Sequence, residues 1–292
     1  MIVVMANLCA LWRGEPLAGR TLVVHSEQRN GDDIQMVRFR PQLVGRVRDE
    51  GGRLVLAVRR ALVPLFERFH ADCVSIEEGP LGKPDFGLPM MSTPLVLGLQ
   101  PEPVRGAAYL QADPPRLVQW RTKVKAGDAH RVRLRVGLVW SGSPTHRRGA
   151  KRSMPLASLA RVLAVPDVVF YPLTPGLSAD VWVMTAQGYR VRDLTGHYEA
   201  GLDDVAALVT ALDDIVTVDS APLHLGGSPG RPVLPMPDHV SHWSWGNAEE
   251  QPWYDSVQLC RQPEPGAWAP VVEKVAARLE AMARELASLT HG

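Results

Sequence analysis

Short apolar runs alternate with amphipathic or polar segments along most of the chain, in two successive blocks. Strands are predicted in the first block at 21–25, 53–58 and 72–76, and in the second at 136–140, 168–171, 189–191 and 215–218. Helices are predicted between them at 34–40, 62–69, 154–163, 179–187 and 203–212. Strands that alternate with helices form parallel sheets covered by helices. We therefore expect an α/β protein with two Rossmann-like, doubly wound domains that face each other across a cleft.

The length of the chain fits two domains. Its 292 residues are 46% hydrophobic, which is enough for two cores of ordinary size. The polar and basic stretch 127–135 predicts the boundary, so we expect domains at 1–130 and 131–266. Residues 267–292 should be a C-terminal helix, because apolar residues recur there at spacings of three and four.

Charge and cysteine usage exclude several classes of protein. The net charge of +1 provides no field that would favour nucleic acid or an anionic membrane. Cys9, Cys73 and Cys260 lie far apart, which indicates neither a disulfide framework nor a zinc site. The apolar run 1–12 has no basic residue before it and is too short to span a bilayer. We expect a cytoplasmic protein with no metal, no cofactor and no integral membrane segment.

One stretch combines a predicted buried strand with a phosphate-friendly turn. The apolar run from Ile215 to Val218 ends on Asp219 and Ser220, and Pro222 suits the first turn of a following helix. A helix N-terminus at the carboxyl end of a parallel strand offers free N–H groups to a phosphate. The alternative is an ordinary strand-to-helix connection capped by these two residues.

A second strand end carries small and basic residues. The strand that ends near Trp140 leads into Ser141 and Gly142, where the backbone can approach a ligand closely because glycine has no Cβ. The basic run 145–153 follows and includes Lys151 and Arg152, whose charges suit a diphosphate. The alternative interpretation is a tight turn followed by a solvated basic loop.

Titratable residues gather around the first strand-to-helix loop. His25, Glu27, Asp32 and Asp33 lie there, where a general base for an acceptor hydroxyl would stand. Helix capping by Asp32 is the alternative, and the two roles are compatible.

Aromatic residues concentrate after the last predicted strand of the second domain. Trp243, Trp245, Trp253 and Tyr254 lie in one polar loop region. Aromatic faces stack on sugars and bases. Packing of loops against one another is the alternative, and we expect it for at least two of them.

The order of motifs resembles a known family. Residues 13–28 resemble the linker and first strand of bacterial proteins that join tetratricopeptide repeats to a glycosyltransferase domain, and Gly31-Asp32-Asp33-Ile34-Gln35 resembles their Gly-Asp-x-Ile-Gln segment. Further matching segments follow in the expected order at 136–143, 152–156, 218–221, 224–225, 230–233, 252–254 and 261–263. These domains are similar to ADP-heptose heptosyltransferases, which have the glycosyltransferase-B architecture.

The resemblance implies a glycosyltransferase that moves a sugar from a nucleotide-diphosphate donor to a hydroxyl acceptor, metal-independent and inverting. It implies catalysis by Asp32 with His25 nearby, and an acceptor that is a sugar, a lipid-linked molecule or a protein. The donor would bind in the second domain, to Ser141, Gly142, Lys151, Arg152, Thr174, Asp219, Ser220, Ala221 and His224.

Three departures from the family pattern keep other interpretations open. Arg29 and Asn30 replace a Gly-Leu pair, Thr174 stands where an amide is usual, and Pro235 and Pro237 interrupt an apolar strand. Because proline cannot donate in a central ladder, that strand should end early or lie at an edge. The alternatives are a degenerate, non-catalytic domain that binds a nucleotide or a protein partner, and a nucleotide-sugar epimerase or hydrolase. The donor base and sugar, the acceptor and the oligomeric state cannot be derived from the sequence.

Overall fold

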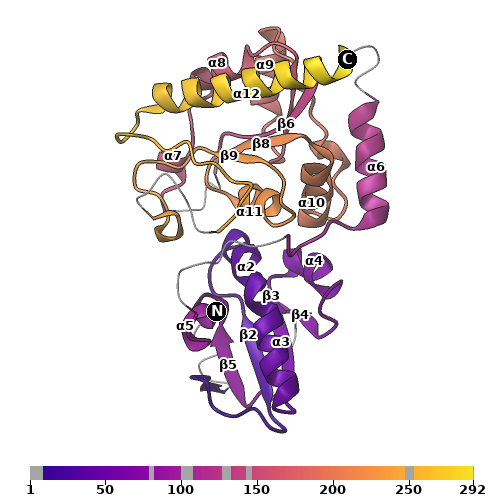
Figure 1. Ribbon diagram of the computed structural model, residues 1–292, viewed down its shortest axis with the longest axis vertical. Coiled ribbons are helices and arrows are strands. Elements are labelled where there is room, and N and C mark those ends of the chain that lie inside the picture. The colour runs from indigo at the N-terminus through magenta and orange to yellow at the C-terminus, as the bar shows by residue number, and fades with distance from the viewer. Residues whose placement is uncertain are drawn as a thin grey trace. The chain divides into compact units, whose positions relative to one another are not determined.

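The computed structural model describes residues 9–78, 82–99, 108–126, 133–142, 147–246 and 253–291. The chain divides into two compact units, 1–103 and 104–292 (Figure 1). The division falls earlier than the boundary predicted at 130/131, because the helix at 114–125 packs on the helix at 202–211 of the second unit. The C-terminal helix likewise belongs to the second unit.

The first unit is a parallel sheet with helices, as the alternating pattern predicted. Among its described residues the strand order is β1-β5-β2-β3-β4, and all pairs are parallel. The strands are β1 (Ala10–Leu11), β2 (Thr21–His25), β3 (Arg53–Val58), β4 (Cys73–Ser75) and β5 (Phe86–Pro89). The α-helices are α2 (Asn30–Met36), α3 (Arg40–Asp49), α4 (Val63–Glu67) and α5 (Thr93–Val96). Short 3-10 turns lie at η1 (Val37–Phe39), η2 (Arg60–Leu62) and η3 (Met90–Ser92).

Two details of the first unit differ from the prediction. The helix expected at 34–40 begins at Asn30, so Asp32 and Asp33, which were expected at its start, lie in its first turn. Pro41 directly follows the range expected for this helix, yet it lies in the first turn of a further helix, α3. Proline is tolerated there because the N–H that it lacks has no partner within the helix.

The second unit contains another parallel sheet. The described strand order is β7-β6-β8-β9, with β6 (Leu134–Val139), β7 (Val168–Pro172), β8 (Asp214–Thr217) and β9 (Val233–Pro235). Its α-helices are α6 (Pro114–Lys125), α7 (Gly149–Arg152), α8 (Ala160–Leu163), α9 (Ser178–Ala186), α10 (Leu202–Ala211), α11 (Ala221–Gly227) and α12 (Trp268–His291). Its 3-10 turns are η4 (Leu156–Leu159), η5 (Thr195–His197) and η6 (Trp243–Trp245). Instead of the strand predicted at 189–191, an isolated bridge joins Val191 to Phe170.

Pro235 and Pro237 lie where they do not break a central strand, as the sequence predicts. β9 is an edge strand of the described sheet and ends at Pro235, so neither this proline nor Pro237 interrupts a central ladder. The Pro235 carbonyl still accepts a hydrogen bond, from the Cys260 N–H at 2.8 Å.

The core of each unit follows from the strand composition. Leu22, Val24, Leu56 and Leu88 are buried in the first sheet. In the second sheet, Val136 and Leu138 of β6 and Ile215 and Val216 of β8 are fully buried. Burial on both faces explains why these strands are apolar runs without alternation.

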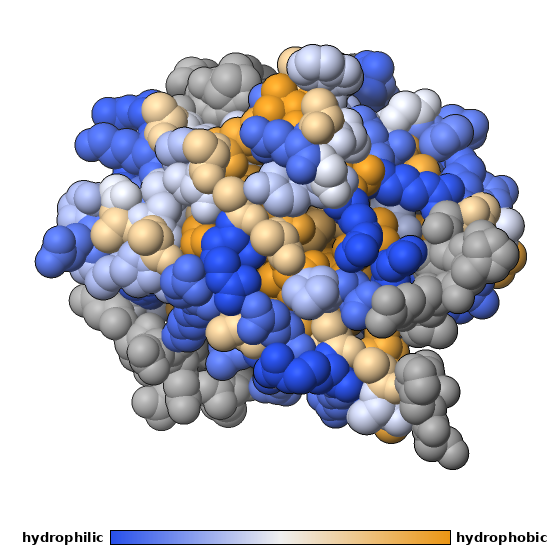
Figure 2. Space-filling view, turned by 90° about the horizontal axis from the view of Figure 1, so that it is seen from above, coloured by the Kyte–Doolittle hydropathy of each residue, from blue (hydrophilic) through white to orange (hydrophobic). Residues whose placement is uncertain are grey.

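The C-terminal helix α12 docks through one face. Val271, Val275 and Leu279 are buried at a spacing of four, and α12 contacts α8. Arg161 of α8 pairs with Glu273 and Glu280 of α12 at 3.2 and 2.7 Å. Hydrophobic residues on the face of the molecule in Figure 2 occur in separate groups between hydrophilic ones. Among the helices of the described residues, none has the length and apolar character to cross a membrane.

Candidate active site

The predicted donor segments meet at one edge of the second sheet. Val139 of β6 pairs with Thr217 of β8, so residues 140–142 and 218–220 leave the sheet at the same level. β7 lies on one side of this pair and β9 on the other, which makes the β6–β8 junction the point where the strand order reverses. In open α/β sheets, ligands bind at the carboxyl ends of the strands at such a point.

A guanidinium joins the two loops. Nη2 of Arg152, at the end of α7, lies 3.1 Å from Oδ2 of Asp219 and also donates to the Asp219 backbone carbonyl. Both side chains are largely buried, which strengthens their attraction relative to a surface pair. The structure therefore brings Arg152 and Asp219 together, as a shared donor site requires.

The turn at Ser141 and Gly142 is held by the side chain of Ser153. Ser153 Oγ accepts a hydrogen bond from the Gly142 N–H at 3.1 Å, lies 3.4 Å from Ser141 Oγ, and donates to the Gly149 carbonyl at 2.8 Å. A Cβ added to Gly142 would meet no atom within 4 Å. The turn is thus fixed from one side and open beside Gly142, which suits close approach of a ligand.

The remaining predicted donor residues occupy different environments. Ser220 is the extended residue before α11, and its Oγ lies 3.0 Å from Thr217 Oγ1, while Ala221 begins the helix. Thr174 is half-buried after the end of β7, on the same sheet edge, whereas Lys151 is exposed on α7.

His224 was predicted to contact the donor, but the structure places it in a packed cluster. Its side chain is buried, its Nδ1 lies 2.9 Å from the Tyr254 hydroxyl, and its ring stacks on Trp245 with centroids 5.6 Å apart. The Tyr254 hydroxyl in turn lies 3.3 Å from that of Tyr109. These contacts give His224 a packing role, and its contact with the donor stays a prediction.

The glycines of α11 also have a packing role. A Cβ at Gly226 would lie 2.7 Å from Val233 Cγ2, and one at Gly227 would lie 2.7 Å from the Tyr254 ring. Glycine weakens a helix intrinsically, so its presence at two adjacent positions of α11 needs a structural reason. The structure shows that close contact with β9 and Tyr254 requires these glycines.

Asp238 is a site residue that the sequence reasoning missed. It follows the end of β9, and its Oδ2 lies 2.5 Å from Nη2 of Arg148. Burial raises the pKa of Asp238, and the negative charge of Asp219 adds to this, whereas Arg148 and Arg152 oppose it. A carboxylate after a third strand end of the same sheet was the available signal.

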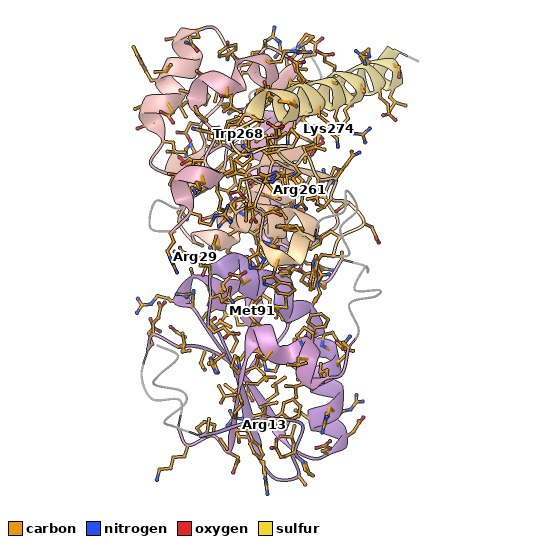
Figure 3. The ribbon with its side chains drawn as sticks, turned by 90° about the vertical axis from the view of Figure 1, so that its left-hand side faces the viewer. Arg13, Arg29, Met91, Arg261, Trp268 and Lys274 are labelled. Atoms are coloured by element: carbon orange, nitrogen blue, oxygen red, sulfur yellow. The ribbon has the colours of Figure 1, made fainter. Side chains whose placement is uncertain are left out.

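The first unit gathers its titratable residues at the carboxyl edge of its own sheet. The strand order reverses between β2 and β5, and there Glu27 Oε1 accepts a hydrogen bond from the Met91 N–H at 3.0 Å. Figure 3 shows Arg29 and Met91 at one end of this unit and Arg13 at the other. Burial raises the pKa of Glu27, and the nearby Asp32 carboxylate adds to the effect, while the hydrogen bond from Met91 opposes it.

The two residues predicted to be catalytic lie in different settings. Asp32 is half-buried in the first turn of α2, where its Oδ2 accepts a hydrogen bond from the Arg29 N–H at 3.0 Å. His25 is buried at the end of β2, with Nδ1 3.3 Å from the Ser26 carbonyl. Burial lowers the pKa of His25, although that contact acts in the opposite direction. Asp32 therefore has the helix-capping contact that was the alternative to a base role.

Asp33 is the most perturbed acid of this loop. Its side chain is fully buried, Oδ2 accepts a hydrogen bond from Ser26 Oγ at 2.5 Å, and Oδ1 has no hydrogen-bond partner among the residues that the structure describes. Ser26 Oγ also accepts from the Arg59 N–H at 3.2 Å. Burial raises the pKa of Asp33 to about 7, against the opposing effects of Ser26 and Arg59.

Among the residues that the structure describes, no group of three or more His, Cys, Asp or Glu side chains could hold a metal ion.

The first comparison is with protein sequences and family models. No protein-family model matches the chain. It is 29% identical over 290 residues to protein FlbA of Caulobacter vibrioides, which covers 92% of this chain but only 48% of FlbA. The chain thus spans about half the length of this relative.

Solved structures provide the second comparison. A family 9 glycosyltransferase from Veillonella parvula covers 93% of this chain and 100% of its own, with 13% identity and a TM-score of 0.60. ADP-heptose lipopolysaccharide heptosyltransferase II of Escherichia coli covers 90% and 99%, with 15% identity and a TM-score of 0.56. Heptosyltransferase WaaC of E. coli, with a fluorinated ADP-heptose, covers 90% and 99%, with 12% identity and a TM-score of 0.52. The chain therefore has a glycosyltransferase fold of the heptosyltransferase type, which confirms the predicted α/β class with parallel sheets.

Proposed function

We propose that this protein is a glycosyltransferase that moves a sugar from a nucleotide-diphosphate donor to a hydroxyl acceptor. The observation that carries the proposal is the convergence of Gly142, Arg152 and Asp219 at the strand-order reversal of the second sheet. The fold shared with heptosyltransferases supports the same reaction class. In two of these neighbours the names specify an ADP-heptose, which makes a nucleotide-activated sugar the first donor class to test.

The donor diphosphate is proposed to bind between the Gly142 turn and Asp219–Ser220. Arg148 and Arg152 approach this region from one short segment, and each pairs with a carboxylate. A diphosphate would take up guanidinium hydrogen bonds that these carboxylates now accept, because Arg binds phosphate oxygens in a bidentate manner. The cationic side chains would then stabilise the leaving group without a metal ion.

The acceptor hydroxyl is proposed to be activated by the first unit. Asp32 would accept the hydroxyl proton while the oxygen attacks the anomeric carbon. The bond between that carbon and the diphosphate oxygen breaks, the diphosphate leaves with the electron pair, and the configuration inverts. This reaction requires the two units to face one donor and one acceptor, as in the two-domain cleft that the sequence predicts. The tetratricopeptide context, a cytoplasmic location and the acceptor classes stay predictions.

A non-catalytic domain that binds a nucleotide is the second candidate. The observation that favours it is the cap at α2, where the Asp32 carboxylate already accepts a hydrogen bond from the Arg29 N–H. This cap gives Asp32 a structural role that requires no catalysis.

Thermal-shift measurements with ADP-, UDP-, GDP- and dTDP-sugars test both candidates. Because a ligand that binds only the folded state raises the unfolding temperature, at least one donor is expected to stabilise the protein. Arg152→Ala should abolish that shift, whereas Arg121→Ala, which removes an exposed arginine of α6, should keep it. If no donor stabilises the wild type, both candidates are wrong.

Mass spectrometry of the products then separates the candidates. With a stabilising donor and a panel of sugar acceptors, Asp32→Asn should retain donor binding and lose transfer. Transfer by Asp32→Asn at the wild-type rate would exclude Asp32 as the base, and donor binding without transfer by the wild type would favour the non-catalytic domain.

A further inference from the structure

The aromatic loop after β9 contains one tryptophan that packing does not explain. Trp245, Trp253 and Tyr254 are buried, as expected of residues that pack loops together. Trp243 is 63% exposed. Leaving an indole in water forgoes the free energy of its burial, so an exposed tryptophan in an ordered loop suggests contact with a partner or ligand.

The Trp243 ring is braced from two sides. It lies edge-on to Trp253, with ring centroids 6.3 Å apart, and tilted against His242 at 5.4 Å. The backbone beside it is also fixed, since the indole N–H of Trp253 donates to the Ser244 carbonyl at 2.6 Å. The ring therefore loses little freedom when a ligand binds, which favours affinity.

The loop that carries Trp243 is tied to the candidate donor site at both ends. On one side, Arg148 pairs with Asp238 and donates to the Val240 carbonyl. On the other side, Trp245 stacks on His224 of α11, the helix that follows Asp219 and Ser220. Trp243 thus lies on a loop whose flanking residues contact Arg148 on one side and the helix that follows Ser220 on the other.

Hydrogen-bonding groups lie in the same segment as Trp243. Arg261, labelled in Figure 3, donates to Ser241 Oγ at 2.7 Å and to the Trp245 carbonyl at 3.1 Å. His242 Nδ1 lies 2.8 Å from Ser244 Oγ. A pyranose needs an apolar surface for its C–H face and polar groups for its hydroxyls, and a site with a few placed polar groups around an aromatic wall supplies both.

We propose that Trp243 is the stacking platform for the sugar ring of the donor. The inference rests on the proposed function and deepens it, because it assigns the transferred group, rather than the nucleotide, to the loop after β9. Loss of the indole should weaken binding of a nucleotide sugar and leave binding of the nucleotide diphosphate alone unchanged.

Isothermal titration calorimetry of the full chain tests the proposal. The ligands are four pairs: ADP and ADP-glucose, UDP and UDP-glucose, GDP and GDP-mannose, and dTDP and dTDP-glucose. For the pair that binds best, Trp243→Ala should weaken the nucleotide sugar about tenfold, a typical effect of truncating an aromatic anchor. Trp243→Phe should retain most of the affinity because it keeps an aromatic face.

Trp182→Ala is the matched control, because it removes an indole of α9 that is 70% exposed. It should bind both members of the pair like the wild type. Unchanged nucleotide-sugar affinity in Trp243→Ala would overturn the stacking proposal, as would an equal loss for both members of the pair. The donor site itself would survive either result if Arg152→Ala still lost the nucleotide diphosphate. If the wild type bound no member of any pair, the proposed function and this inference would both be wrong.

Discussion

The Arg152 guanidinium links the ends of two neighbouring strands, because its Nη2 lies 3.1 Å from Asp219 Oδ2 and also donates to the Asp219 carbonyl. The two residues are 67 positions apart in the chain. Their pairing closes the loop after β6 onto the loop after β8, so one side chain joins both sides of the proposed donor site.

The first prediction concerns this pair in the absence of a ligand. Arg152→Ala leaves the largely buried Asp219 carboxylate without its cation, so the free energy of unfolding should fall by about 1–3 kcal/mol. Urea denaturation measures the change. Arg152→Lys should recover part of the stability and less of the nucleotide affinity, since an ammonium group cannot bind in a bidentate manner. Wild-type stability in Arg152→Ala would show that the pair contributes nothing.

The second prediction separates two helix glycines. A Cβ at Gly227 would lie 2.7–2.9 Å from three atoms of the Tyr254 ring, so Gly227→Ala should destabilise the protein by about 1–3 kcal/mol. A Cβ at Gly45 of α3 meets no atom within 4 Å, so Gly45→Ala should stabilise it by about 0.5–1 kcal/mol. Thermal unfolding of the two variants measures both effects, and equal effects of both substitutions would contradict the packing role of Gly227.

The third prediction concerns the carboxylate that fixes α6 on α10. Asp204 accepts hydrogen bonds from the Trp120 indole at 3.0 Å, from Arg116 Nη1 at 3.1 Å, and from the Glu199 and Ala200 N–H groups at 2.7 and 2.6 Å. Asp204→Ala should cost about 3–5 kcal/mol, because it orphans several buried donors at once. Arg116→Ala removes one of these donors and also the partner of Asp203 at 3.3 Å, and it should cost less than Asp204→Ala. Denaturant titration of the two variants should rank them in this order.

The lowered pKa of Asp204 also makes the stability of the folded state sensitive to acid. Burial acts to raise its pKa, but the hydrogen bonds from Ala200, Trp120 and Glu199 outweigh it, and the pKa lies below its ordinary value of 3.8. A lowered carboxyl pKa contributes stability above the ordinary value and loses it as the pH falls through the folded-state value.

The sequence predicts the fold better than the site. Apolar strands, polar turns and amphipathic helices are local patterns, and they located β2, β3, β6, β7, β8 and α12 to within a few residues. The proximity of Arg152 and Asp219 could be predicted for a similar reason, since parallel strands bring their carboxyl ends to one edge. The packing of His224 against Trp245 and Tyr254 could not be predicted, because it depends on contacts between segments that are far apart in the sequence.

Long-range contacts also explain the misplaced boundary. The basic stretch before β6 suggested a linker, but α6 precedes it and is held to α10 by Arg116 and Trp120 through Asp204. Burial of Asp33 was equally hidden, since its position in the sequence beside Asp32 does not reveal which of the two faces the core.

The last prediction uses the buried Asp33 carboxyl as a pH-sensitive group. Its pKa is raised to about 7 from the ordinary value of 3.8, so the folded state binds more protons than the unfolded state between these values. Stability should therefore fall as the pH rises through this window and level off above it. Asp33→Asn cannot ionise, and its advantage over the wild type should grow from about pH 4 to about pH 7. Urea denaturation at a series of pH values measures the difference, and comparison of the two proteins cancels the similar contribution of Asp214, whose pKa is also about 7.

Ser26→Ala is the matched test, because it removes the hydrogen bond that holds the Asp33 pKa down and should move the window to higher pH. Parallel stability curves for Asp33→Asn and the wild type would exclude Asp33 as the titrating group.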